Sequence, residues 1–320
     1  MVQVLTPVEA EKKYGKTFCK RFITLVDEKA GRVRIIESCT SVGPAEWDIV
    51  NLRRSRGAVK NIRNKYGSLE IDAEIGESEI KFGPASEGLG ARCIKKISIE
   101  GDEVRMTWYA LAGATVGIGA CLPACPDIIR TEYPDDFKIG GGHMSNVDII
   151  TPKYVRVVIG IDDTDTKEKG ATWVVGMKMG LNCPIGRFIE HKIIQLNPKA
   201  PNKTTNCCST AVVFAVRESE KQALIDYAKK FVAAESYSDD AVMAVYQGLE
   251  VPREVSEFGW TCKSVLFSVE DAQKIADENG IEVIRLKGGN GGVIGAVAAI
   301  GCSEMDERSA GIPEDFQDIV

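Results

Sequence analysis

Three aspartates occupy four positions in the segment Asp162-Asp163-Thr164-Asp165, directly after the apolar run 155–161. Carboxylates this close repel one another, and crowding them costs free energy unless a cation neutralises them. Hard divalent cations such as Mg²⁺ prefer carboxylate oxygens and often share them with substrate phosphates. The segment therefore indicates a metal–nucleotide site near the middle of the chain. A solvated acidic turn is the alternative, because Asp also favours turns through local hydrogen bonds.

Two later segments have residues suited to phosphate contacts. The stretch 196–206 is stiffened by two prolines, and its Lys203 and Thr204 could meet phosphate oxygens. The stretch 287–301 runs from a glycine-rich turn into an Ala-rich helix, whose first N–H groups favour an anion. It is not a Walker A motif, because no Gly-Lys-Ser/Thr ends the loop. The alternatives are an ordinary surface Lys-Thr pair and a tight turn before a buried helix.

The histidines and cysteines exclude some kinds of chemistry. The chain has 2 histidines, so a His-rich zinc site is excluded. Its first residues lack the basic segment and apolar core of a signal peptide, so we expect a cytoplasmic protein whose 10 cysteines are reduced. Cys121 and Cys125 leave a metal, redox or packing role open, and Cys207 fits packing or the lining of an active site.

Length and charge limit the class of protein. A chain of 320 residues fits two domains, which we place at 1–150 and 151–320. No apolar run approaches the length of a membrane span, so we expect no membrane partner. The net charge of −6 provides no global positive field for nucleic acid, and we expect no DNA partner. A local basic cluster, Arg53, Arg54, Arg56, Lys60, Arg63 and Lys65, is either a solvated helix face or an RNA or nucleotide contact.

The first half is expected to be a mixed α+β domain. Its pattern predicts a hairpin over 17–38, a helix over 44–66, strands near 69–75, 93–99 and 103–111, and a loop or linker over 123–152. The small residues at 113–120 fit either a phosphate-binding segment or a tightly packed helix.

The second half alternates strand and helix patterns, which predicts an α/β or α+β domain with helices packed on a sheet. Strands are expected at 155–162, 187–197, 209–217, 241–247, 262–268 and 281–287, and helices at 170–181, 219–235, 269–279 and 292–302. The order of these strands in the sheet is left open.

Three motifs, taken in order, resemble those of archaeal tRNA-isoleucine agmatidine synthetase. The first is Gly160-Ile161-Asp162-Asp163-Thr164-Asp165 with Thr172 seven residues later. The second is Leu196-Asn197-Pro198 followed by Lys203-Thr204, and the third is the run 291–301. The match covers about residues 155–302. The whole chain, including Gly117-Ile118-Gly119-Ala120-Cys121-Leu122-Pro123, looks most like methanogenesis marker protein 11, an archaeal family without an assigned activity.

The resemblance implies a kinase-type α/β domain that binds ATP and Mg²⁺. Transferred by position, Asp162, Asp163 and Asp165 hold Mg²⁺, and Thr172 is the phosphate acceptor or a phosphate contact. Lys203 neutralises phosphate charge. The expected catalytic residues are therefore Asp162, Asp163, Thr172 and Lys203. The residues expected to bind the cofactor are Thr164, Thr204, Gly288, Gly289, Asn290, Gly291, Gly292 and Gly295. Phosphoryl transfer depends on positioning and charge neutralisation more than on histidine.

Three functions follow from these expectations. The first is an ATP- and Mg²⁺-dependent kinase- or ligase-like enzyme of methanogens that activates an oxygen of an RNA or protein substrate. The second is a tRNA-modifying enzyme that acts with an RNA-binding partner, since the synthetase's zinc ribbon and RNA modules are not seen in this chain. The third is a non-catalytic nucleotide-binding assembly or regulatory protein, which the replacement of the motif's arginine by Thr205 favours.

Overall fold

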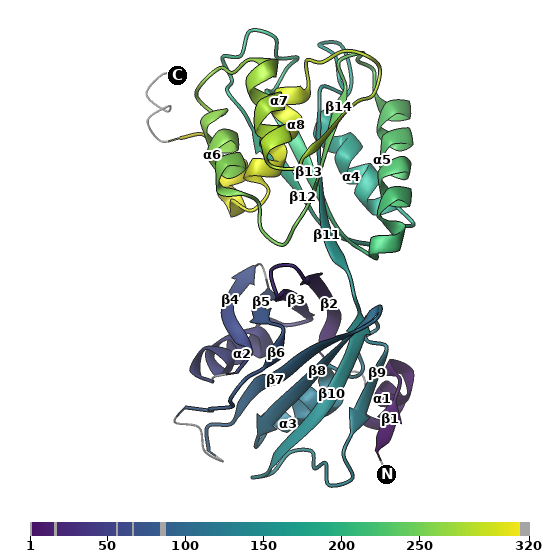
Figure 1. Ribbon diagram of the computed structural model, residues 1–320, viewed down its shortest axis with the longest axis vertical. Helices are drawn as coiled ribbons and strands as arrows, with labels where there is room; N and C mark the ends of the chain where they lie inside the picture. The colour runs from purple at the N-terminus through teal and green to yellow at the C-terminus, as the bar shows by residue number, and fades with distance from the viewer. Residues whose placement is uncertain (1, 16–17, 56, 66, 84–87, 314–320) are drawn as a thin grey trace. The chain divides into compact units, whose positions relative to one another are not determined.

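Residues 2–15, 18–55, 57–65, 67–83 and 88–313 are described by the structure, a computed structural model. The chain divides into two compact units, Met1–Tyr154 and Val155–Val320 (Figure 1). None of the helices in the described ranges combines the length and the apolar character that crossing a membrane requires.

The first unit is built from two antiparallel sheets. One has the order β1 (Gln3–Leu5), β9 (Arg130–Tyr133), β10 (Met144–Pro152), β8 (Glu103–Leu111), β7 (Ala91–Glu100) and β6 (Gly76–Glu77). The other has the order β2 (Cys19–Asp27), β3 (Arg32–Cys39), β5 (Ser68–Glu74) and β4 (Val59–Lys65). The helices are α1 (Pro7–Tyr14), α2 (Val42–Arg54) and α3 (Ala114–Val116), the last continued by a π-helical turn over Gly117–Cys121.

The expected hairpin and the three expected strands of this unit are confirmed, but two other expectations are wrong. The stretch 123–152 is not a linker, because it forms β9 and β10, whose alternate residues are buried. The helix expected over 44–66 ends at Arg54, and β4 pairs with β5 instead. Of the two alternatives for 113–120, the structure has the packed helix, because α3 and the π-helical turn that follows it are mostly buried.

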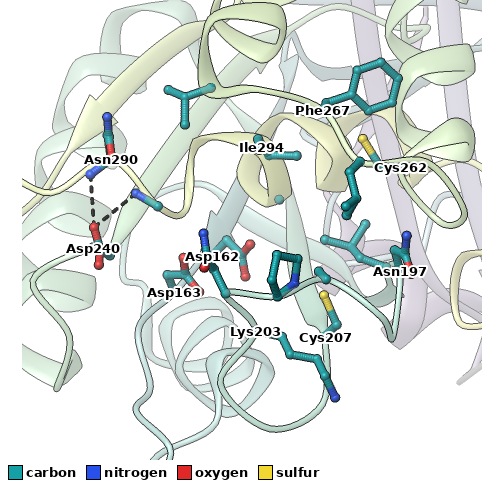
Figure 2. A pocket seen from close by; sticks show the side chains of 18 of the residues that line it. Asp162, Asp163, Asn197, Lys203, Cys207, Asp240, Cys262, Phe267, Asn290 and Ile294 are labelled. Carbon is teal, nitrogen blue, oxygen red and sulfur yellow. Dashed lines mark hydrogen bonds between the residues drawn. The ribbon is translucent and has the colours of Figure 1, made fainter.

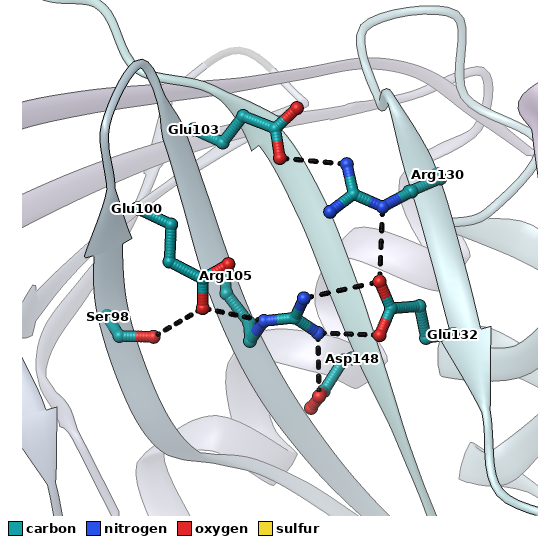
Figure 3. Close-up of polar contacts among 7 residues, drawn as sticks. All are labelled: Ser98, Glu100, Glu103, Arg105, Arg130, Glu132 and Asp148. Carbon is teal, nitrogen blue, oxygen red and sulfur yellow. Dashed lines mark hydrogen bonds and ion pairs between the residues drawn. The ribbon is translucent and has the colours of Figure 1, made fainter. Parts of the chain in front are cut away.

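Several cationic side chains of this unit are paired with carboxylates. On β4, Lys60 lies 2.9 Å from Glu74 and Arg63 lies 3.0 Å from Glu70, while Arg56 falls outside the described residues. On the other sheet, Arg105 contacts Glu100, Glu132 and Asp148, and Arg130 contacts Glu103 and Glu132 (Figure 3). The basic cluster does not form one helix face, because Arg53 and Arg54 end α2 whereas Lys60, Arg63 and Lys65 lie on β4. Lysines and arginines already engaged by carboxylates also have less charge to offer RNA phosphates.

The second unit is a five-stranded sheet covered by helices on both faces (Figure 1). Its strand order is β12 (Arg187–Gln195), β13 (Cys208–Val216), β11 (Val155–Asp162), β14 (Val242–Gln247) and β15 (Glu282–Arg285), with every pair antiparallel. Helices α4 (Thr172–Asn182) and α5 (Lys221–Glu235) cover one face. Helices α6 (Arg253–Thr261), α7 (Val269–Glu278) and α8 (Val293–Cys302) cover the other.

Five of the six strands and all four helices expected in this unit are confirmed. The exception is 262–268, where a turn follows α6 and leads to α7, and α6 itself was not expected. The chain is therefore a mixed α and β protein with several sheets. Because the strands of the second unit are antiparallel, its sheet is of the α+β kind rather than a parallel α/β sheet.

Candidate functional site

One end of the five-stranded sheet carries a cavity of about 460 Å³ (Figure 2). The antiparallel pairing creates it, because Asp162 at the end of β11 lies opposite Val242 at the start of β14. Val242 in turn pairs with Arg285 at the end of β15. The loops that follow β11, β12 and β15 and the loop that precedes β14 therefore converge, although they lie far apart in the sequence.

Asp162 packs against the first turn of α8. A Cβ atom at Gly295 would overlap the Asp162 carboxylate, so only glycine allows the helix to come this close. The same close packing recurs at Gly160 of β11, where an added Cβ would overlap the carbonyl oxygen of Ala296 in α8. The two glycines of the first and third sequence motifs thus serve one purpose, which is to bring α8 onto β11 directly beside the aspartates.

The two aspartates at the cavity carry an electrostatic penalty. Burial, followed by the charge of Asp163, raises the pKa of Asp162 well above its ordinary value. Burial, followed by the charges of Asp240 and Asp165, raises the pKa of Asp163 to about 6. Asp163 also has a left-handed backbone with φ of 52°, a conformation that Asp tolerates better than most residues. A cation beside these carboxylates would relieve the repulsion.

The donor set fits Mg²⁺ bound together with phosphates rather than by protein alone. Within the described ranges, no three His, Cys, Asp or Glu side chains are arranged to hold one ion. Mg²⁺ needs only one or two carboxylates when substrate phosphates and water complete its octahedron. Asp162 and Asp163 both line the cavity and meet this requirement, whereas Asp165 does not line it.

Asp165 instead joins two loops by hydrogen bonds. Its Oδ1 accepts from the hydroxyl of Thr172 at 3.2 Å, and its Oδ2 accepts from the hydroxyl of Thr204 at 3.2 Å. The Thr172 hydroxyl also accepts from the backbone N–H of Thr164 at 3.2 Å and lies 3.1 Å from the Thr164 hydroxyl. Asp165, Thr172 and Thr164 are all buried. The arrangement fixes the aspartate segment on the start of α4.

The glycine-rich loop 288–292 passes the cavity on its way into α8. Gly288 has a φ of 97°, which glycine adopts without strain. Asn290 and Gly291 line the cavity, and a Cβ at Gly291 would come within 2.9 Å of Asp163 Oδ2. Asp240, which the sequence did not single out, faces this loop (Figure 2). It could have been noticed only as an acidic pair, Asp239 and Asp240, before an expected strand.

The far side of the cavity is apolar. Its lining includes Leu196, Val265, Leu266, Phe267 and Ile294. Val265 and Leu266 stay largely exposed, so apolar surface is available at the rim. A cavity with carboxylates and backbone amides at one end and apolar side chains at the other has the composition of a small-molecule site.

The loop 196–206 forms another wall. Asn197 anchors it, since its backbone N–H donates to the carbonyl of Cys262 at 3.1 Å and its side chain donates to the carbonyl of Ser264 at 3.1 Å. Lys203 lines the cavity, but its ammonium donates to the carbonyl of Thr205 at 3.5 Å and is turned away from Asp162 in Figure 2. Cys207 lines the cavity as well.

The structure therefore separates the expected site residues into two groups. Those that line the cavity are Asp162, Asp163, Lys203, Asn290, Gly291 and Gly295. Those that lie behind the lining or within the adjoining loops are Thr164, Asp165, Thr172, Thr204, Gly288, Gly289 and Gly292.

Residues 158–224 match the family described as the TiaS TCKD domain. The isoleucine-tRNA 2-agmatinylcytidine synthetase TiaS of Pyrococcus horikoshii is 32% identical over 151 residues, which are 45% of this chain and 35% of that protein. The chain thus spans about a third of the length of this curated relative. The solved complex of TiaS with its isoleucine tRNA and ATP aligns with 46% of this chain and 36% of its own, at 24% identity and a TM-score of 0.41.

A second relative covers nearly the whole chain. It is the uncharacterized protein MJ0921 of Methanocaldococcus jannaschii, which is 34% identical over 302 residues, 93% of this chain and 98% of that protein. Both units of the structure are included in this alignment, whereas the TiaS match covers less than half of the chain. The chain belongs to the family of MJ0921, and its second unit contains a TiaS-like segment.

Proposed function

We propose that the second unit binds ATP with Mg²⁺ and transfers a phosphoryl group to an oxygen of an RNA or protein substrate. The observation that carries the proposal is the position of Asp162 and Asp163 at the cavity wall, beside the glycine-rich entry to α8. The match to the TiaS TCKD domain supports it, since the motifs that the chain shares with that synthetase imply a site for ATP and Mg²⁺.

Each wall of the cavity has a role in this proposal. Asp162 and Asp163 would hold Mg²⁺, which when bound neutralises phosphate charge. The apolar side, with Phe267 and Ile294, accepts the base and excludes water. Lys203 would have to leave the carbonyl of Thr205 and swing its flexible side chain toward the phosphates, where it would add the positive charge that the replaced arginine does not supply.

Thr172 has a positioning role in this proposal rather than that of a phosphate acceptor. Its hydroxyl is buried and is engaged by Asp165 and by two groups of Thr164. Phosphorylating it would require all three contacts to break. Asp165 likewise holds Thr172 and Thr204 and leaves metal binding to its neighbours.

A tRNA-modifying enzyme is the second candidate, and the match of residues 158–224 to a domain of a synthetase named for an isoleucine tRNA favours it. The ion pairs of Lys60 and Arg63 leave β4 with little free positive charge, so RNA binding would depend on a partner protein. A role in methanogenesis stays a prediction. If tRNA co-purifies with the protein and is identified by sequencing, the hypothesis of a tRNA-modifying enzyme is favoured.

The test is calorimetric titration of ATP with and without Mg²⁺. We expect binding with Mg²⁺ and its loss in Asp162→Asn and Asp163→Asn, with Asp239→Asn as a control outside the cavity lining. Unchanged affinity in both cavity variants would disprove the metal–nucleotide site. Incubation with candidate RNA or protein, followed by separation of ADP from AMP, identifies the phosphate that is attacked. Mg²⁺–ATP binding without turnover would instead favour a nucleotide-sensing protein.

A further inference from the structure

The glycine-rich loop already has an acidic partner. Oδ1 of Asp240 accepts hydrogen bonds from the backbone N–H of Asn290 at 3.2 Å and of Gly291 at 3.1 Å (Figure 2). The backbone carbonyl of Asp240 accepts from the N–H of Gly292 at 3.2 Å, and that of Asp239 accepts from the N–H of Gly289 at 3.0 Å. Four successive amides of the loop therefore have acceptors within the protein.

This arrangement changes how phosphate can bind. Backbone amides in a glycine-rich turn commonly bind phosphate directly. Here a carboxylate occupies the position of that anion at Asn290 and Gly291. The same cavity is also lined by Asp162 and Asp163, so a bare polyphosphate would meet three carboxylates. Among the described residues that line the cavity, Lys203 has the positively charged side chain that could offset these carboxylates.

We propose that Asp240 is a specificity-determining residue that excludes bare anions from the glycine-rich loop and makes nucleotide binding depend on a divalent cation. The inference builds on the proposed function and adds its selectivity. Asp162 and Asp163 would hold the cation that phosphates need, while Asp240 holds the loop in place through the amides of Asn290 and Gly291. Asp240 is exposed, so its hydrogen bonds compete with water and leave the loop able to respond to substitution.

Two substitutions separate the charge of Asp240 from its hydrogen bonds. Asp240→Ala removes the charge and frees the amides of Asn290 and Gly291. Asp240→Asn removes the charge but keeps an oxygen that can accept from both amides. Asp239→Ala is the matched control, because it removes one adjacent negative charge while the backbone carbonyl that binds Gly289 stays.

The experiment is calorimetric titration with inorganic pyrophosphate in excess chelator, without divalent cation. Asp240→Ala should bind pyrophosphate at least about tenfold more tightly than the wild type, because two amides become free for a charge-assisted contact. Asp240→Asn should bind pyrophosphate no more than about threefold more tightly than the wild type, because only a charge is lost. The pyrophosphate affinity of Asp239→Ala should equal that of Asp240→Asn or that of the wild type. If Asp240→Ala does not fold, Asp240→Ser, whose hydroxyl is too short to span both amides, replaces it.

Equal gains in the Asn and Ala variants, or no gain in a folded Ala or Ser variant, would overturn the inference. The proposed function fails separately, when wild-type protein does not bind ATP with Mg²⁺. A gain in pyrophosphate affinity by Asp240→Ala together with that failure would leave an anion-excluding loop without a nucleotide function.

Discussion

Thr204 donates its hydroxyl to Oδ2 of Asp165 over 3.2 Å, although the two residues are 39 positions apart in the sequence. The other oxygen of the same carboxylate accepts from Thr172 at the start of α4. One buried side chain therefore connects the aspartate segment with the loop that carries Lys203. This contact holds the loop at the cavity together with the two hydrogen bonds of Asn197.

Thr204→Val should weaken Mg²⁺–ATP binding about five- to tenfold, because it removes a hydroxyl worth about 1 kcal/mol from the loop. Thr204→Ser keeps the hydroxyl and should bind like the wild type. Calorimetric titration of both variants measures the difference. Equal affinities for the Val and Ser variants would mean that the contact does not position the Lys203 loop.

Gly295→Ala should abolish Mg²⁺–ATP binding and lower the free energy of unfolding by about 1–3 kcal/mol, because its Cβ would overlap the Asp162 carboxylate. Gly43→Ala, on α2 with open space around the added Cβ, is the control. Urea unfolding and calorimetry give the two readouts. A Gly295→Ala protein with normal stability and affinity would contradict the close packing of α8 on β11.

Asp48 should make the stability of the first unit depend on pH. It lies 3.1 Å from Arg92, and burial raises its pKa from 3.8 to about 7, with Arg92 opposing the shift and Glu37 adding to it. Between these values the folded state holds a proton that the unfolded chain has lost, so stability falls as pH rises.

The comparison is urea unfolding of wild type and Asp48→Asn from pH 4 to pH 8. Across this range the wild type should lose on the order of 1–3 kcal/mol relative to the variant, which has no such titration. Asp102→Asn on the exposed turn after β7 should follow the wild type. Parallel curves for wild type and Asp48→Asn would refute the assignment.

Lys263→Met should destabilise the second unit by about 3 kcal/mol or more, since a buried ammonium would be lost from three carbonyl acceptors. Its Nζ donates at 2.8 Å to the carbonyls of Gln195, Ser309 and Gly311. Lys274→Met removes an exposed lysine of α7 and should change stability by less than about 0.5 kcal/mol. Similar unfolding midpoints for the two variants would contradict a stabilising role of Lys263 in holding the segment that contains Ser309 and Gly311.

Local sequence patterns predicted most elements around the site. The apolar run before Asp162 formed β11, and the small residues after Gly292 formed α8. The pattern does not predict β9 and β10, because the glycines and prolines of 123–152 indicate a loop or linker although two strands of the sheet lie within it. It also failed after Arg54, because the basic residues of β4 suit a helix as well as a strand paired with acidic β5.

The chemical types at the site can be read from the sequence: clustered carboxylates, a Lys-Thr loop and a glycine-rich entry to a helix. Which of these groups meet depends on how the strands pair. The antiparallel order of β11, β14 and β15 brought Asp240 to the glycine-rich loop, and the folded loops placed the buried Asp165 between Thr172 and Thr204. Periodicity reports how a residue lies on its own strand or helix, whereas strand order and register set which distant loops share one edge of a sheet.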